Sequence, residues 1–161
     1  MGDCLSIELL KSISENPIPV LSRGARGMER IRSREKRIKE WRDIAESITS
    51  QLRDVPISNS GGNGNRIERA VVSIVSLQEE IAEEIAEIVK CEQETEEIIK
   101  WLVEDEDHKA LLEHRYLERK DWETVAEEMG YSTRWALSLH RRAIQKMKMA
   151  ADERIAILSD Q

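Results

Sequence analysis

One long apolar stripe constrains the fold of this chain more than any other feature of its sequence. Residues 66–103 carry apolar side chains at the three- and four-residue steps of an α-helix. At 1.5 Å per residue, such a helix is roughly 55 Å long. A helix with one apolar side is not stable alone in water, so it must pack on another helix. The stripe consists of Ile67, Val71, Ile74, Leu77, Ile81, Ile85, Ile88, Ile98, Ile99 and Leu102.

A shorter helix that can cover part of this stripe is predicted over residues 28–52. Its apolar positions alternate by three and four, and they are Ile38, Trp41, Ala45, Ile48 and Leu52. Residues 54–65 hold a proline and clustered Gly, Asn and Ser, which indicate a flexible linker or hairpin loop. Residues 28–104 are therefore predicted to form a helical hairpin or coiled coil for assembly. Pairing within one chain is one interpretation; a homodimer or higher homo-oligomer is favoured, because the shorter helix leaves part of the stripe uncovered.

The composition supports an all-α fold and argues against a large globular core. Charged residues make up 35% of the chain, aromatic residues only 4%, and phenylalanine is absent. The formal net charge is -7, but residues 78–107 alone contain thirteen Asp or Glu against Lys90 and Lys100. The rest of the chain is net basic, so the overall charge does not exclude an anionic partner.

Residues 122–147 read as two short helices joined by a tight turn. Val125, Ala126 and Met129 share one face of the first helix, and Gly130 follows where the chain must reverse. Ser132 is then placed to cap the second helix. This spacing is typical of a helix-turn-helix motif. The residues of the second helix predicted to face inward are Ala136, Leu139, His140, Ala143 and Met147.

The outward face of the second helix has no acidic residue. No Asp or Glu occurs between Gly130 and Ala151, although the chain as a whole is acidic. A helix N-terminus with hydroxyls and an arginine, followed by a basic flank, can contact base edges in the major groove and the phosphates alongside. The alternative is a solvated basic face. The candidate DNA-binding residues are Ser132, Thr133, Arg134, Trp135, Leu137, Ser138, Arg141, Arg142, Gln145 and Lys146.

Residues 111–147, LLEHRYLERKDWETVAEEMGYSTRWALSLHRRAIQKM, resemble region 4 of bacterial sigma factors. In that family a leading helix ending in RYLE precedes a Trp-initiated helix-turn-helix and an RRAI-type tail. The longer run of residues 38–147 is similar to phage and prophage proteins related to phage late-transcription activators. The resemblance implies that residues 105–150 form a DNA-binding domain and that the protein acts with host RNA polymerase. Nothing in the chain resembles the promoter-melting region of a sigma factor.

Both ends of the chain are predicted to lie outside these domains. Residues 1–27 are predicted to be a mobile or docking arm, because Pro17 and Pro19 end a short amphipathic helix. Residues 151–161 are predicted to be a C-terminal tail. A second, phosphate-contacting arm is formed in one interpretation by Arg23, Arg26, Arg30, Arg32 and Arg34. In the alternative interpretation, this basic stretch pairs with the acidic helix of the same or another chain.

No catalytic, cofactor or metal site is predicted. Cys4 and Cys91 lack disulfide or ligand spacing, and His108, His114 and His140 form no metal pattern. There is no phosphate-binding glycine loop and no nucleophile with a base, so an enzyme is not expected. No apolar run suits a signal peptide or membrane span, and we expect a protein of the bacterial cytoplasm, associated with the nucleoid.

The sequence therefore predicts a regulator of phage transcription that binds double-stranded DNA sequence-specifically. Activation through host RNA polymerase is the mode that the resemblance implies. Two other classes remain open. A small DNA-packaging (terminase) subunit also combines a helix-turn-helix with a long helical hairpin, and it assembles as a ring. A protein-interaction module would bind RNA polymerase without DNA.

Overall fold

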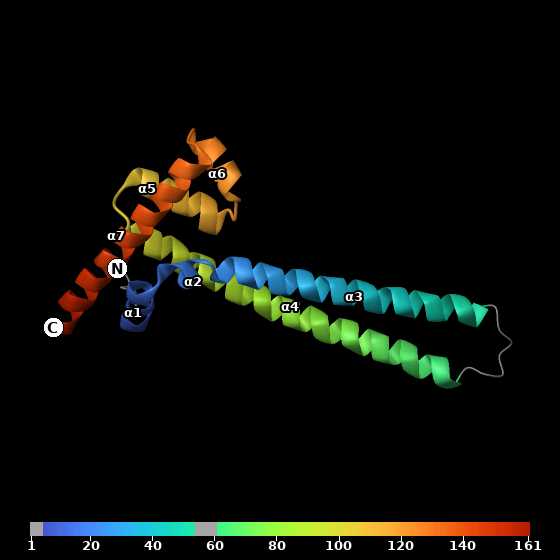
Figure 1. Cartoon of the computed structure of the whole chain (residues 1–161). Coiled ribbons are helices and arrows are strands. Elements are labelled where there is room, and N and C mark those ends of the chain that lie inside the picture. Colours follow the sequence, from blue (N-terminus) through green and yellow to red (C-terminus); the bar gives the residue numbers. More distant parts are fainter. Residues whose placement is uncertain (1–4, 54–60) are drawn as a thin grey trace. The chain divides into compact units, whose positions relative to one another are not determined.

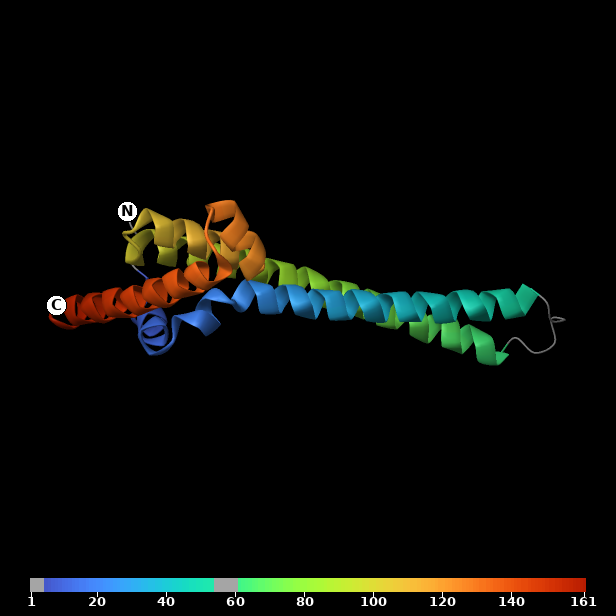
Figure 2. The ribbon, with the colours of Figure 1, turned by 45° about the horizontal axis from the view of Figure 1, so that its top comes forward.

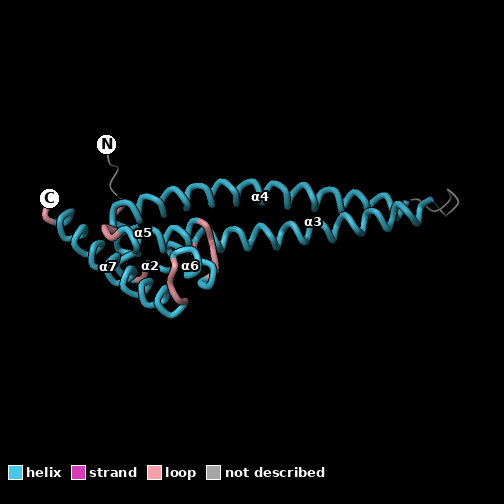
Figure 3. Tube along the Cα trace, turned by 90° about the horizontal axis from the view of Figure 1, so that it is seen from above, coloured by secondary structure: helices cyan, strands magenta, loops and turns pink. Residues whose placement is uncertain are grey.

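The structure, a computed structural model, describes residues 5–53 and 61–161. Every secondary-structure element in those two ranges is a helix (Figure 3), which confirms the predicted all-α class. The chain divides into two compact units: Gly27–Glu87 forms one, and Met1–Arg26 together with Ile88–Gln161 forms the other. Within the described ranges, no helix combines the length and hydropathy needed to cross a membrane.

Two long helices, α3 (Arg23–Arg53) and α4 (Gly61–Leu102), supply the first unit. Within it, residues 27–53 of α3 and 61–87 of α4 form a hairpin and run side by side in opposite directions (Figures 1 and 2). Each helix begins five residues before its predicted start, at residue 23 instead of 28 and at 61 instead of 66. Residues 61–65, predicted as linker, are therefore helical. Extending a helix adds a hydrogen bond per residue without a new nucleus, so weak helix formers can be included. The rest of the predicted linker, residues 54–60, lies outside the described residues.

Side chains that repeat at alternating steps of three and four residues form the seam of the hairpin. On α3, Ile31, Ile38 and Ile48 are buried, in a row that also contains the predicted Trp41 and Ala45. On α4, every residue of the corresponding row is buried or partly buried. This row is Ile67, Ala70, Ile74, Leu77, Ile81, Glu84 and Ile88.

Two residues of the predicted apolar stripe, Val71 and Ile85, lie outside the seam. Their side chains are 52% and 50% exposed, so α3 covers neither of them. The seam positions belong to Ala70 and Glu84, one residue earlier and about 100° away around the helix. The prediction followed the large apolar residues, whereas the strict repeat runs through a small residue and a charged one.

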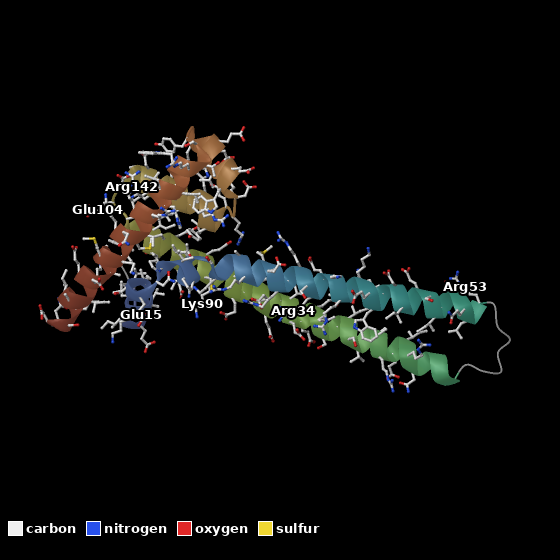
Figure 4. All side chains as sticks on the ribbon, in the orientation of Figure 1. Glu15, Arg34, Arg53, Lys90, Glu104 and Arg142 are labelled. Carbon is white, nitrogen blue, oxygen red and sulfur yellow. The ribbon has the colours of Figure 1, made fainter. Side chains whose placement is uncertain are left out.

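A charged cluster occupies one layer of the seam. Arg34, labelled in Figure 4, donates from Nε to Glu80 over 2.9 Å, and its Nη1 lies 3.4 Å from Glu84. Arg30 donates from Nε to Oε1 of Glu84 over 3.0 Å. This hydrogen bond from Arg30 is the main cause that lowers the pKa of Glu84. Such a cluster favours one register of the hairpin, because a slip would leave a charge without its partner.

The second unit has its core along α7 (Thr133–Ser159). Three short elements precede α7 and pack with it: α5 (Glu106–Leu112), the π-helical turn η2 (Glu113–Leu117) and α6 (Trp122–Met129). The C-terminal end of α4 belongs to the same core through Ile98 and Ile99. The other central members of this core are Leu111, Leu112, Tyr116, Val125, Ala126, Ala136, Leu139, Ala143 and Met147.

The segment predicted as a mobile arm is instead part of this core. Residues 7–21 form α1 (Ile7–Glu15) and α2 (Pro17–Leu21), and both helices contact α7. Leu10 and Ile13 are fully buried. Pro17 ends α1 as expected, yet it also occupies the first position of α2, where its fixed backbone angle suits a helix start. Residues 1–4 lie outside the described residues.

The predicted C-terminal tail is also helical. α7 continues to Ser159, and Ala151 within it is fully buried. Ile155 and Leu158 pack against the core, and Asp152 accepts a hydrogen bond from Ser14 on α1. α1 supplies the apolar surface that this stretch of α7 covers. Packing of α1 against α7 therefore explains why neither the predicted arm nor the predicted tail lies outside the core.

Candidate nucleic-acid interface

The connection between α6 and α7 has the predicted turn residues in the predicted roles. Gly130 has φ 73°, in the left-handed region that favours glycine. The next amide, of Tyr131, donates to the carbonyl of Ala126 over 2.8 Å and closes the end of α6. Ser132 then caps α7, accepting from the amide of Trp135 over 3.2 Å. Tyr131 and Ser132 thus connect the turn at Gly130 to α7 and set the direction of α7 relative to α6.

The inward face of α7 also agrees with the prediction. Ala136, Leu139, Ala143 and Met147 are buried, and His140 is half-buried. His140 has a specific hydrogen-bond partner, because its Nε2 lies 2.7 Å from the hydroxyl of Tyr116, on η2.

Burial changes the ionisation of both partners in this bond. It lowers the pKa of His140 to about 4 and raises the pKa of Tyr116 to about 12. At neutral pH, both partners of this hydrogen bond are therefore uncharged. The edge of Trp122 also meets the His140 ring, with centroids 4.7 Å apart. These contacts hold α7 on the elements that precede it.

The candidate residues on the outward face of α7 are accessible. All of them are exposed except Ser138, which is partly buried. Among the ion pairs between described residues, none uses Arg134, Arg141 or Arg142. The first turn of α7 contains no acidic residue, so the partial positive charge of the helix N-terminus is unopposed there. This face can therefore receive an anion.

An aromatic–cation stack, which sequence reasoning missed, organises part of this face. The guanidinium of Arg142, labelled on α7 in Figure 4, lies 4.8 Å from the ring centre of Trp135. The edge of Tyr131 lies against the same ring, with centroids 6.3 Å apart. Trp135 remains 47% exposed. The signal in the sequence was the seven-residue spacing of Trp135 and Arg142, which places them on one side of a helix two turns apart.

Lys146 differs from the other cations of the face. Its charge is one of the smaller causes that lower the pKa of Asp105, after the hydrogen bond from the His108 amide. It also lines a groove of about 650 Å³, whose apolar lining includes Trp101, Met149 and Ile157. His108 lines this groove too; it is 4% exposed, and among the described residues its Nδ1 has no hydrogen-bond partner.

The arginines of the predicted second arm have partners within the chain. Arg23 donates to the carbonyl of Val20 over 2.9 Å and lies 2.8 Å from Glu94, and Arg26 donates to the carbonyl of Pro19 over 2.7 Å. Arg32 lies 3.5 Å from Glu29. The ion pairs of Arg23, Arg30 and Arg34 with acidic residues of α4 agree with the alternative interpretation, in which the basic stretch pairs with the acidic helix. The partners of Arg26 and Arg32 lie outside α4.

A charged cluster with metal-ligand chemistry links η2 to α6. Ligand atoms of His114, Glu118 and Glu128 lie within 4.8 Å of one another. Nζ of Lys120 lies among them, 3.1 Å from Nδ1 of His114 and 2.5 Å from Glu128, and it also contacts Glu118. The hydrogen bond from Lys120 is the first cause that lowers the pKa of Glu118. The lysine ammonium thus takes the position that a cation would need.

Fold and site together define an all-α protein with a long helical hairpin and a compact helical unit that exposes a basic helix face. The chain belongs to the family described as "Protein of unknown function (DUF1492)", whose model matches residues 48–148. The match runs from the end of α3 into α7 and contains all the candidate residues 132–146. Neither a curated protein nor a solved structure matches the chain.

Proposed function

We propose that this chain is a sequence-specific DNA-binding regulator of transcription, with α6 and α7 as a helix-turn-helix and α7 as the recognition helix. The observation that carries the proposal is the outward face of α7. In a chain of net charge -7, this face is exposed, has no carboxylate between Gly130 and Ala151, and begins at a capped helix N-terminus. Phosphates and base edges are the ligands that such a face fits best.

The residues of the face divide into two roles by their position along α7. Ser132, Thr133 and Arg134 stand at the N-terminus, where a recognition helix approaches base edges; an arginine there can bond two acceptors of guanine. Leu137 and Trp135 offer apolar surface for a thymine methyl group. The remaining polar residues, further along α7, are assigned to phosphates; these are Ser138, Arg141, Arg142, Gln145 and Lys146.

Action with host RNA polymerase is the part of the proposal that rests on resemblance. Residues 111–147 resemble sigma-factor region 4, and the hairpin precedes them as in the phage activators. Assembly through the long helices would place two recognition helices on one DNA duplex. Two half-sites raise affinity through effective concentration, which a single small helix-turn-helix needs.

The test is selection of bound sequences from a random DNA library by the full chain, followed by affinity measurements at several salt concentrations. Arg134→Ala should relax sequence preference. Arg141→Ala should weaken binding to all sequences and reduce the salt slope by about 0.9 for one lost phosphate contact. Lys36→Ala, an exposed cation on α3, is the matched control and should change neither quantity. No DNA binding at low salt would refute the proposal.

A second candidate function, a protein-binding module without DNA, is favoured by the groove between the end of α4 and α7. Trp101 is 39% exposed, Met149 61% and Ile157 62%, and they lie along the same groove. Exposed apolar side chains in a groove are typical of a surface that binds another protein. If Met149→Glu abolishes regulation in cells while DNA affinity is unchanged, the groove contributes a protein partner to the same regulator. If DNA binding is absent altogether, the groove becomes the main functional surface.

A further inference from the structure

A second repeat runs along α4, one residue after the seam. Its members are separated by steps of four, three, four, three and four residues, which is the spacing of a coiled-coil contact. The four largest are about half exposed: Val71 52%, Val75 47%, Ile85 50% and Val89 48%. We call this row the outer stripe. It consists of Val71, Val75, Gln78, Ala82, Ile85 and Val89.

The outer stripe belongs to a broad face with little charge. One residue along a helix turns the side chain by about 100°, so the outer stripe and the seam with α3 are different faces of α4. Val72, which is 61% exposed, and Ala86 border the outer stripe, and Glu79 is the only charged residue within this face. A helix with two apolar faces is typical of bundles in which it contacts two neighbouring helices. α3 is one neighbour, so a second long helix fits the remaining face.

The spacing of the outer stripe allows a second copy of α4 to be that helix. Read backwards, the steps are again four, three, four, three and four, so a second α4 in the opposite direction meets it in register. In an antiparallel pair, Val71 faces Val89 of the second copy, Val75 faces Ile85, and Gln78 faces Ala82. In the two central layers, the larger side chain of Gln78 then lies over the small side chain of Ala82. A parallel pair would instead place Ala82 on Ala82 and leave a gap.

We propose that the outer stripe is the dimer interface of this protein and that its occupant is α4 of a second copy, in antiparallel orientation. Self-complementarity is what a two-fold interface requires, because the same patch must bind itself. The outer stripe extends over roughly 27 Å, the length of about two and a half heptads. The proposal gives the assembly in the proposed function a specific surface, yet it rests on α4 alone. Its failure would leave DNA binding by the single copy untouched.

Glu79 makes the orientation testable. Near the centre of the antiparallel pair, at the edge of the contact, Glu79 of one copy approaches Glu79 of the other. The two carboxylates repel each other, so Glu79→Gln should tighten the dimer by about two- to fivefold. Glu83 lies about 40° further around α4 from the outer stripe than Glu79 does, and Glu83→Gln is the matched control.

The experiment is sedimentation equilibrium of the full chain over a range of protein concentrations. A monomer–dimer equilibrium is expected. Val75→Glu and, independently, Ile85→Glu should give monomers with unchanged helical content by circular dichroism. Ile44→Glu is the control: Ile44 is 40% exposed on α3 and lies in a different groove, with Asp43, Ser47 and Arg66, so this variant should remain dimeric.

Several results would overturn the proposal. A monomer at all concentrations would exclude the dimer, and a larger ring would exclude the two-fold interface. Dimers of normal affinity in both Val75→Glu and Ile85→Glu would place the interface elsewhere. A weaker or unchanged dimer in Glu79→Gln would rule out the antiparallel register. The affinity of the monomeric variants for a single DNA half-site is measured in parallel and should stay normal. This measurement separates a failure of the dimer from a failure of the proposed DNA binding.

Discussion

The burial of His140 makes the second unit sensitive to acid in a defined range of pH. Burial lowers the pKa of His140 from 6.5 to about 4, so the folded protein keeps this imidazole neutral where the unfolded chain protonates it. The unfolded state binds more protons between these two pKa values. Stability is therefore fully present above pH 6.5 and decreases as the pH falls from about 6.5 to about 4.

The two pKa values also give the size of the effect. Between pH 7.5 and pH 5, proton binding to His140 in the unfolded state should lower the free energy of unfolding by roughly 2 kcal/mol. His108 acts in the same direction, because burial lowers its pKa as well. Four carboxyl groups also have lowered pKa values, and the stability that they contribute is lost only at lower pH. These groups are Glu84, Asp105, Glu118 and Asp121.

The assay is denaturant unfolding at pH 7.5 and pH 5 for the natural chain and for His140→Gln. Glutamine can donate or accept a hydrogen bond with Tyr116 but does not titrate, so the difference in the free energy of unfolding between the two pH values should shrink by roughly 2 kcal/mol. NMR titration of the His140 ring should give a midpoint near 4. A midpoint near 6.5, or the same pH difference in the variant, would refute the burial argument.

Three further predictions follow from particular contacts. Leu10→Ala should destabilise the second unit by about 2–5 kcal/mol, because Leu10 is fully buried in the predicted arm, whereas Ile7→Ala, at a 44% exposed position, should change stability by less than about 1 kcal/mol in thermal unfolding. Gly130→Ala should cost about 1–2 kcal/mol through its positive φ alone, since no atom lies within 4 Å of an added Cβ; an unchanged melting temperature would contradict this. Trp135→Ala and Arg142→Ala should be non-additive in DNA affinity, with a coupling of about 0.5–1 kcal/mol in a double-mutant cycle, because the ring holds the guanidinium.

Local patterns explain why much of the fold and part of the site could be predicted from the sequence. The three- and four-residue steps identified both long helices, and the residue types at Gly130 and Ser132 identified the turn and the cap before α7. The inward row of α7 and its outward, acid-free face follow from the same period. These features depend on residues within a few positions of one another, so their physical cause lies in the local sequence.

Contacts between distant residues decided the rest. The sequence showed that α4 has apolar residues, but the position of α3 determined that Ala70 and Glu84 lie in the seam while Val71 and Ile85 are exposed. Similarly, a short amphipathic segment between prolines looked mobile, and only packing of α1 on α7 gave it a place in the core. The period of a helix is encoded locally, whereas the face that is buried depends on which partner the chain brings to it, and that partner can lie more than a hundred residues away.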